Sequence, residues 1–214
     1  MTMSRDATPA DFPAVLALNE AFVAVLSPLD GARLARLHAQ AALHRVIERD
    51  GRVEAFLLAL REGADYDSPN YRWFAQRYPR FLYVDRIVVA GDAQARGAGC
   101  RLYRELYALA VRDTVPWITC EFDIEPPNPV SERFHTGLGF REVGRQPPAW
   151  RTQDRFAAGA RCRRGRHAAG RPRRRLTSGV LRESAAMLRR QRAMLVIITP
   201  GGSRHDYGLR QDEE

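Results

Sequence analysis

Residues 84–99 read VDRIVVAGDAQARGAG, and this stretch decides the fold of the chain. It continues a run that begins at residue 81, and the nearly continuous apolar end of 81–89 predicts a strand buried on both faces. The small residues of 91–99 predict a tight turn, and 100–112 has apolar residues at helical spacing. A buried strand is therefore expected to run through a glycine-rich turn into a helix.

The turn between this strand and helix favours an anion. Residues 94–99 (QARGAG) are small enough for the backbone to wrap closely round a ligand. Their N–H groups, the helix dipole and the charge of Arg96 all favour a phosphate or pyrophosphate. A dinucleotide fold fits less well, because its third glycine would fall at Leu102 and no acid ends a strand about 20 residues later. A turn whose glycines serve sterics alone stays open.

Helices and strands alternate on both sides of this stretch. A helix is predicted over 11–26 with Asp11 as its N-cap, and a second from 30 to about 40. Asp50-Gly51 between two strand-like runs, 44–49 and 52–60, predicts a hairpin. After an aromatic loop at 62–80 and the stretch quoted above, the predicted elements are a strand over 117–122, a short helix over 130–136 and a strand from 140. This order indicates an α/β (α+β) fold with a mixed sheet.

A second motif follows about 30 residues after the first. Residues 128–140 read NPVSERFHTGLGF, with Asn128, Ser131, Phe134, Gly139 and Phe140 at fixed spacing. Together the two motifs resemble the GNAT acetyltransferase superfamily, in which Q/R-x-x-G-x-G/A binds the pyrophosphate of coenzyme A. The resemblance covers roughly residues 5–146. The PPNP segment before the second motif and the YVDRIVV strand resemble a bacterial branch of that superfamily.

The resemblance implies a fold, a cosubstrate and a set of binding residues. The expected sheet is mixed and mostly antiparallel, is flanked by helices, and has two central strands, 81–89 and 117–122, that splay apart. Acetyl-CoA is expected between them, with its pantetheine paired to main-chain groups like an added strand. The residues expected to bind it are Ile87, Val88, Val89, Gln94, Ala95, Arg96, Gly97, Ala98, Gly99, Asn128 and Ser131.

The implied activity is transfer of an acetyl group to an amine by direct attack, without a metal. A backbone N–H of the first splayed strand would polarise the thioester carbonyl. The amine needs a base, and Asp85 and Glu121 are the candidates, with Asp123 as a weaker third. An ion pair with Arg86 or another arginine would equally explain Asp85, and a solvated strand end would explain Glu121.

The departing thiolate needs a proton. The family usually places a tyrosine after the motif phenylalanine, and this chain has His135 there, which can donate a proton near neutral pH. His135 could equally be a helix residue bonded to the loop, and Tyr103 or Tyr107 stays open as the acid. Aromatic residues could wall the acceptor pocket, although core packing explains them as well: Tyr71, Trp73, Phe74, Tyr78, Phe81 and Tyr83.

The C-terminal part differs sharply in charge. Residues 1–150 hold 18 Arg and 19 acids, a net of −1, whereas 151–214 hold 16 Arg and 6 acids, a net of +10. We therefore predict a domain over 5–146 and an Arg-rich tail over 151–214, disordered or translated out of frame, since prolines stand where a last strand is due. A marginal helix over 178–196 is the other local possibility. The tail as a non-specific nucleic-acid-binding extension, and a GNAT-like fold without activity, are the alternatives.

Composition excludes several chemistries. The 214 residues contain 34 arginines and no lysine, so no lysine can bind phosphate, form a Schiff base or act as a base. Three scattered cysteines indicate neither a disulfide framework nor a metal site. No signal peptide or membrane span is indicated, so a cytoplasmic protein is the expectation. An incomplete sheet edge would favour a homodimer.

Overall fold

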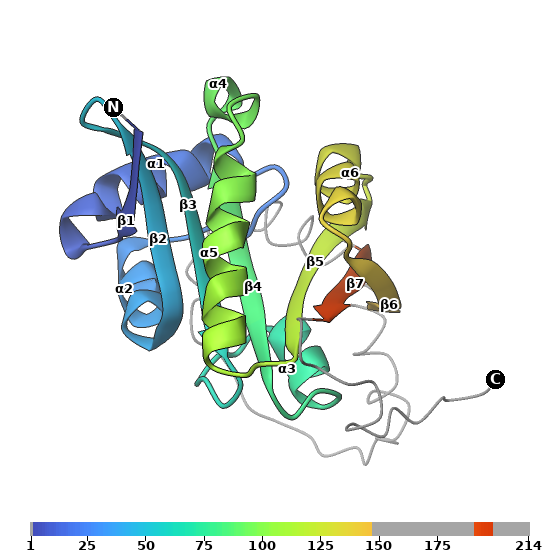
Figure 1. Ribbon diagram of the computed structural model, residues 1–214. Coiled ribbons are helices and arrows are strands. Elements are labelled where there is room, and N and C mark those ends of the chain that lie inside the picture. Colours follow the sequence, from blue (N-terminus) through green and yellow to red (C-terminus); the bar gives the residue numbers. More distant parts are fainter. Residues whose placement is uncertain (1, 147–190, 199–214) are drawn as a thin grey trace, which may run out of the picture.

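The computed structural model describes residues 2–146 and 191–198 (Figure 1). These residues form one seven-stranded sheet in the order β1-β2-β3-β4-β5-β7-β6. The strands are β1 Thr2–Asp6, β2 Ala41–Arg49, β3 Arg52–Arg61, β4 Phe81–Val89, β5 Trp117–Glu125, β6 Arg141–Gln146 and β7 Gln191–Ile198. The helices are η1 Pro9–Asp11, α1 Phe12–Ala21, α2 Gly31–Gln40, α3 Pro69–Ala75, α4 Gly91–Gln94, α5 Ala98–Arg112 and α6 Pro129–Gly137.

The sheet is antiparallel except at its centre, where β4 and β5 are parallel. These two strands pair only over Phe81–Tyr83 and Trp117–Thr119, although β4 continues to Val89 and β5 to Glu125. Beyond the paired residues they separate, and Figure 1 shows them diverging toward α4 and α6. The mixed, mostly antiparallel sheet with splayed central strands is therefore confirmed.

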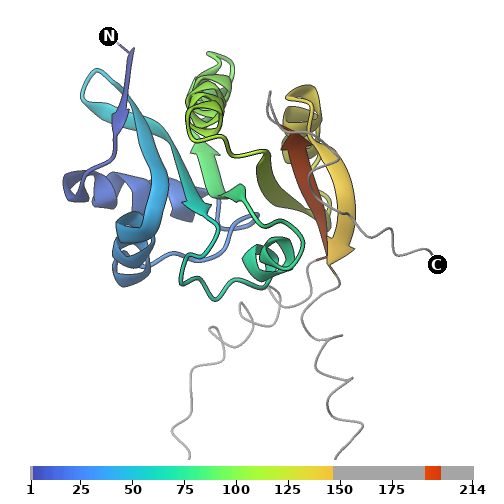
Figure 2. The ribbon, with the colours of Figure 1, turned by 60° about the horizontal axis from the view of Figure 1, so that its bottom comes forward.

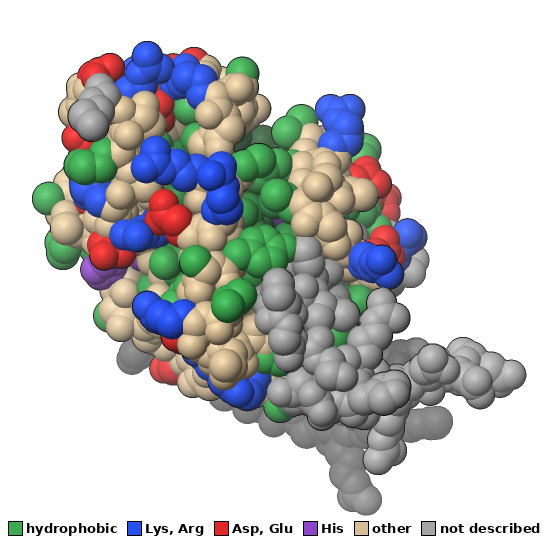
Figure 3. All heavy atoms as spheres, in the orientation of Figure 1, with side chains coloured by type: hydrophobic (Ala, Val, Ile, Leu, Met, Phe, Trp, Pro, Cys, Tyr) green, Lys and Arg blue, Asp and Glu red, His purple; other side chains and the backbone are tan. Residues whose placement is uncertain are grey.

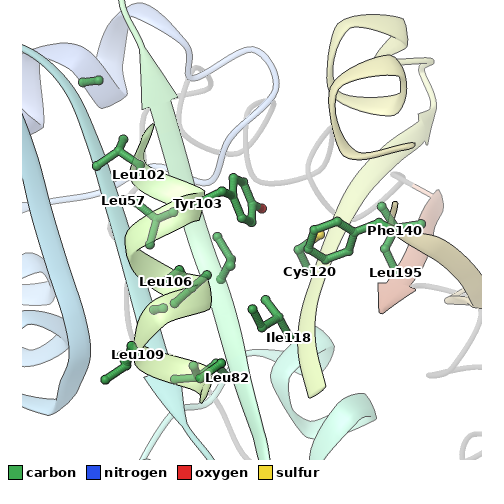
Figure 4. Packing of buried hydrophobic residues seen from close by; sticks show 14 of the residues in the cluster. Leu57, Leu82, Leu102, Tyr103, Leu106, Leu109, Ile118, Cys120, Phe140 and Leu195 are labelled. Atoms are coloured by element: carbon green, nitrogen blue, oxygen red, sulfur yellow. The ribbon is translucent and has the colours of Figure 1, made fainter. Parts of the chain in front are cut away.

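Helices cover both faces of the sheet because its inner strands are apolar on both sides. In β3, Ala55, Leu57 and Ala59 face α5, and the alternate residues face α1, α2 and α3. Helix α5 lies in front of the sheet in Figure 1, with α1 and α2 behind it. Figure 4 shows the α5 side, where the helix turns a row of buried residues toward the strands: Leu102, Tyr103, Leu106 and Leu109. The helical spacing of 100–112 had predicted this row.

Local signals explain where several elements begin. Asp50 and Gly51 both have positive φ, 51° and 78°, as a two-residue hairpin turn between β2 and β3 requires. The carboxylate of Asp30 accepts a hydrogen bond from the Arg33 N–H at 2.7 Å, which caps α2. Ser68 caps α3 in the same way, within the segment expected to be mainly loop.

The first helix differs from the prediction. It ends at Ala21 rather than 26, and Asp11 does not cap it through its side chain. The two carboxylate oxygens of Asp11 instead accept hydrogen bonds from Arg5 at 2.8 and 2.7 Å. Arg5 therefore ties β1 to the start of α1 with the charge that was expected to cap the helix.

The last strand comes from the segment predicted to be a tail. Strand β7, Gln191–Ile198, lies between β5 and β6 and pairs antiparallel with both, as Figure 2 shows beside β6. The helix considered for 178–196 is therefore wrong for 191–196. The out-of-frame hypothesis drew on the jump in charge and on the loss of pattern where a last strand is due, and β7 supplies such a strand. Residues 151–190 and 199–214, with the nucleic-acid-binding hypothesis that concerns them, lie outside the described residues.

Among the described residues, no helix is both long enough and apolar enough to cross a bilayer.

Candidate active site

The splay between β4 and β5 exposes main-chain groups of β4. The Ala90 N–H donates to the carbonyl of Glu54 on β3 at 2.8 Å, so alternate residues of β4 turn their main chain toward β3. By this alternation, Val88 pairs with β3, whereas Ile87 and Val89 direct their N–H and C=O groups toward the separated β5. Of the three predicted strand residues, Ile87 and Val89 therefore direct N–H groups that no described residue occupies toward the opening, and Val88 does not; the Val89 carbonyl is taken by Gln94.

The glycine-rich turn ends in three N–H groups that have no hydrogen-bond partner among the described residues. Gly97 has φ 74°, a left-handed conformation that suits glycine, and α5 begins at the next residue. The first main-chain hydrogen bond of α5 runs from the Arg101 N–H to the Gly97 carbonyl at 3.0 Å. The N–H groups of Ala98, Gly99 and Cys100 at the start of this 15-residue helix consequently have no partner within it.

The polar side chains of this turn are already engaged. Gln94 donates to the Val89 carbonyl at 3.1 Å, which fixes the end of β4. The Arg96 guanidinium lies 2.8 Å from a carboxylate oxygen of Glu54. Ala95 lies at the end of α4. The predicted anion site is thus built from backbone amides, and the Arg96 charge is shared with Glu54.

The two sequence motifs meet at Gly99. A Cβ built there would lie 2.9 Å from Cζ of Phe134 on α6 and 3.6 Å from Cγ2 of Val89. Only a glycine allows α6 to approach α5 this closely. Figure 3 shows hydrophobic side chains gathered at the surface between these two helices.

Asn128 and Ser131 shape the start of α6. The Asn128 side-chain oxygen accepts from the Ser131 N–H at 3.1 Å and caps the helix. Ser131 Oγ lies 3.1 Å from Nδ1 of His135. The structure therefore gives both predicted binding residues a role within α6, at the rim of the splay.

His135 is buried, with only 4% of its surface exposed. Its Nδ1 lies 2.8 Å from the Ser131 carbonyl, and its Nε2 lies 2.8 Å from the hydroxyl of Tyr103. Burial lowers the pKa of His135 and raises that of Tyr103 well above its ordinary value, so both are neutral at pH 7. Figure 4 shows Tyr103 reaching from α5 toward Cys120 on β5. His135 and Tyr103 form one hydrogen-bonded pair, which joins two candidates that the sequence left as alternatives.

Asp85 and Glu121 occupy equivalent places at the opening of the splay. Each lies two residues beyond the last paired residue of its strand, Tyr83 on β4 and Thr119 on β5. Both line one pocket with a volume of about 60 Å³. The other residues lining it come from the segment after α1, the loop before α3, the two splayed strands and β7: Val25, Leu26, Ser27, Tyr66, Ser68, Tyr83, Arg86, Phe122, Asp123 and Arg192.

Asp85 is fully engaged. It is the extra residue of a β-bulge, because Val84 pairs with Ala59 and Arg86 with the adjacent Leu58. One carboxylate oxygen of Asp85 accepts from the Arg86 Nε at 2.6 Å, and the other accepts from the Tyr66 hydroxyl. Arg86 also donates to Asn19 at 2.7 Å. The ion pair with Arg86, the structural alternative for Asp85, is present.

Glu121 keeps one oxygen free. Its Oε1 accepts from Asn70 at 2.7 Å and from the Tyr83 hydroxyl at 2.9 Å, and it lies 3.3 Å from Arg192. Its Oε2 is buried and has no hydrogen-bond partner among residues 2–146 and 191–198. Burial raises the pKa of Glu121 to about 7, against the lowering effects of Arg192 and Tyr83. A carboxylate in this state can accept a proton near neutral pH.

Several residues that line the pocket or contact Glu121 were missed or only partly found from the sequence. Asn70 and Tyr66 gave no signal in a turn-rich loop, and Arg192 lay in the segment predicted to be a tail. Tyr83, placed among aromatic wall candidates, does reach Glu121. Most of the other aromatic candidates pack in the core behind the sheet instead: Tyr71, Phe74, Tyr78 and Phe81.

A splayed central strand pair above an amide-lined turn defines the GNAT acetyltransferase fold, and comparison with solved structures agrees. The ribosomal-protein-S18-alanine N-acetyltransferase of Escherichia coli is similar with a TM-score of 0.59 at 14% identity, over 95% of this chain and 98% of that one. A GNAT-family acetyltransferase of Streptococcus pneumoniae gives 0.57 at 12% identity, over 94% and 100%.

The Salmonella typhimurium protein yncA, solved with its cofactor acetyl-CoA, gives a TM-score of 0.56 at 18% identity, over 93% and 94% of the two chains. At these identities the likeness establishes the fold. No protein-family model and no curated protein sequence matches the chain. Within the described ranges, no group of three His, Cys, Asp or Glu side chains could hold a metal ion.

Proposed function

We propose that the protein is an N-acetyltransferase that moves an acetyl group from acetyl-CoA to an amine by direct attack. The observation that carries this proposal is the buried Oε2 of Glu121, which has no partner among the described residues and belongs to a side chain that lines the pocket at the opening of the splay. The fold is shared with N-acetyltransferases, one of them solved with acetyl-CoA.

The residues available fit a coenzyme A substrate. The free amides of Ala98, Gly99 and Cys100 at the start of α5 would bind its pyrophosphate, with the helix dipole adding to the attraction. The main chain of Ile87 and Val89 would pair with its pantetheine arm in the opening that β5 leaves. One of these two amides would also bind the carbonyl oxygen of the thioester as negative charge develops on it.

Glu121 would act as the general base. A primary ammonium is mostly charged at pH 7, so it must lose a proton before its nitrogen can attack. Oε2 of Glu121 takes that proton while Oε1 stays bound to Asn70 and Tyr83. Asp85, whose two oxygens are engaged by Arg86 and Tyr66, would shape the pocket.

The Tyr103–His135 pair would supply the proton for the departing thiolate. The Tyr103 hydroxyl can donate a proton, and Nε2 of His135 lies 2.8 Å from that hydroxyl. Nδ1 of His135 remains bonded to the Ser131 carbonyl, which holds the ring in place. When the amine nitrogen has bonded to the acetyl carbon, the carbon–sulfur bond breaks, and the sulfur takes the Tyr103 proton and leaves as a thiol. The second proton that the nitrogen loses then returns the Tyr103 hydroxyl to its neutral form.

The test is a screen of amines with the full chain, in which release of free thiol from acetyl-CoA is followed. We expect at least one amine to give thiol release above the rate without acceptor, together with an acetylated product by mass spectrometry. Binding of acetyl-CoA without thiol release for any amine would support the alternative, a GNAT-like fold without activity.

A further inference from the structure

Glu121 and Arg192 meet across the β5–β7 ladder, in the pocket described above. Arg192 pairs in register with Asp123, and Asp123 lies two residues from Glu121 along β5. Alternate residues of a strand share a face, so both acids of β5 point to the side from which Arg192 approaches. The Arg192 Nε lies 3.1 Å from Asp123 Oδ1, and its Nη1 lies 3.3 Å from Glu121 Oε1.

These three side chains are shielded from water, so their charges interact strongly. The exposed fractions are 18% for Arg192, 10% for Glu121 and 4% for Asp123. The contact with Glu121 uses Oε1 alone, and Oε2 stays free and buried. One guanidinium thus holds both acids of β5 while leaving one oxygen of Glu121 available.

We infer that Arg192 is a positioning residue for Glu121: it holds Oε1 in place, leaves Oε2 free to accept a proton and favours the ionised form of the carboxylate. The inference rests on the proposed role of Glu121 as base. It assigns a part in the reaction to a strand that follows the Arg-rich segment.

Other groups around Glu121 do not replace this contact. Neutral donors come from α3 and β4, where Asn70 and Tyr83 bind the same oxygen. The Arg86 charge is taken up by Asp85, its neighbour on β4. The remaining titratable groups nearby are neutral or negatively charged: Tyr66 before α3, Tyr103 on α5, and Cys120 and Asp123 on β5. Within the described pocket, Arg192 is therefore the cation that contacts Glu121.

The direct test is the titration of Glu121 in the full chain, read from the carboxyl carbon in ¹³C-glutamate-labelled protein. The signal is assigned by its loss in Glu121→Gln. Arg192→Gln removes the cation, and we expect the pKa of Glu121 to rise by about one pH unit or more. Arg145→Gln, which breaks an exposed pair with Glu142 on β6, is the matched control and should leave the titration unchanged.

Arg192→Lys keeps a charge but cannot reach both acids with a planar fork, so its Glu121 pKa should lie between those of wild type and Arg192→Gln. If Arg192→Gln does not fold, Arg192→Lys carries the test, with a rise as the supporting result. An unchanged Glu121 titration in the folded variant overturns the inference.

The pH profile gives a second readout. If the protein acetylates an amine, the pH at which kcat/KM falls on the acid side should be higher in Arg192→Gln than in wild type, by the same amount as the Glu121 pKa. The rate at high pH should change less. Because the NMR titration needs no turnover, an inactive protein would contradict the proposed function without deciding the role of Arg192. A titration that moves while the acid limb of an active enzyme stays fixed would contradict the positioning role.

Discussion

At the scale of the residue, the account depends on a single carboxylate. Glu121 combines burial, an oxygen without a partner among the described residues and a pKa of about 7, whereas Asp85 at the equivalent place on β4 is also buried but has both oxygens engaged. The sequence placed both acids at the splay. It could not rank them, because the ranking depends on Tyr66, Asn70 and Arg192, which come from other parts of the fold.

Replacing the base gives the first prediction. Glu121→Gln keeps the size of the side chain but removes its ability to accept a proton, and a general base contributes about 10²- to 10⁴-fold to the rate. We expect kcat to fall by about that factor, with the affinity for acetyl-CoA nearly unchanged. Steady-state kinetics and calorimetry measure the two quantities.

The control is Asp67→Asn, which alters an acid that is 72% exposed and paired with Arg33. It should leave kcat unchanged. A Glu121→Gln variant as active as this control would exclude Glu121 as the base.

Gly99 gives a second prediction at the same scale. In Gly99→Ala the new methyl group would meet the Phe134 ring at 2.9 Å, so α5 and α6 must move apart or the ring must turn. Overpacking of this kind costs about 1–3 kcal/mol. Urea denaturation should show that loss. Gly91→Ala, where no atom lies within 4 Å, is the matched control, and equal stabilities of the two variants would contradict the close approach.

At the scale of the element, sequence patterns located most of the strands and helices. The Asp50-Gly51 hairpin, the strand 81–89 and the helix after the glycine-rich turn all depend on local turn chemistry and apolar periodicity, which a sequence displays directly. Strand β7 could not be predicted from such local signals, because its pairing partners are about 45 or more residues away in the chain. Its apolar residues also continue a heptad-like spacing of leucines, which suggested a helix.

The packing of β7 can be tested through Leu195. This side chain is 5% exposed and belongs to the core cluster that also holds Cys120 and Phe140, as Figure 4 shows. Leu195→Ala should lower the free energy of unfolding by about 2–5 kcal/mol. The measurement is denaturation of the full chain.

Val143→Ala on the neighbouring β6 is the control, since Val143 is 40% exposed and its loss should cost about 0.5 kcal/mol or less. If Leu195→Ala were no more destabilising than this control, β7 would not be an inner strand of the sheet.

At the scale of the whole molecule, two buried groups give the stability opposite dependences on pH. Burial lowers the pKa of His44 to about 4, so its contribution is present above pH 6.5 and is lost as the pH falls toward 4. Burial raises the pKa of Glu121 to about 7, so its contribution is present below about pH 4.5 and is lost as the pH rises through 7. Each amounts to about 3 kcal/mol, and the two largely offset each other.

Glu121→Gln should remove one of these two opposing contributions and leave that of His44. Wild type gains stability from Glu121 as the pH is lowered, and the variant does not. When the pH is lowered from 7.5 to 4.5, the free energy of unfolding of Glu121→Gln should therefore fall by about 2–3 kcal/mol more than that of wild type. Denaturant titrations at several pH values measure this difference. Parallel curves for the two proteins would show that Glu121 has an ordinary pKa in the folded state.

The central claim is that the opening between β4 and β5, with the free amides of 98–100 at its end, binds acetyl-CoA through its pyrophosphate. Calorimetric titration of the full chain with acetyl-CoA and with acetylpantetheine, which lacks the pyrophosphate, tests it most directly. We predict saturable one-to-one binding of acetyl-CoA and binding of acetylpantetheine that is at least about tenfold weaker, a loss of about 1.4 kcal/mol. No binding of acetyl-CoA, or equal affinity for the two compounds, would contradict the account.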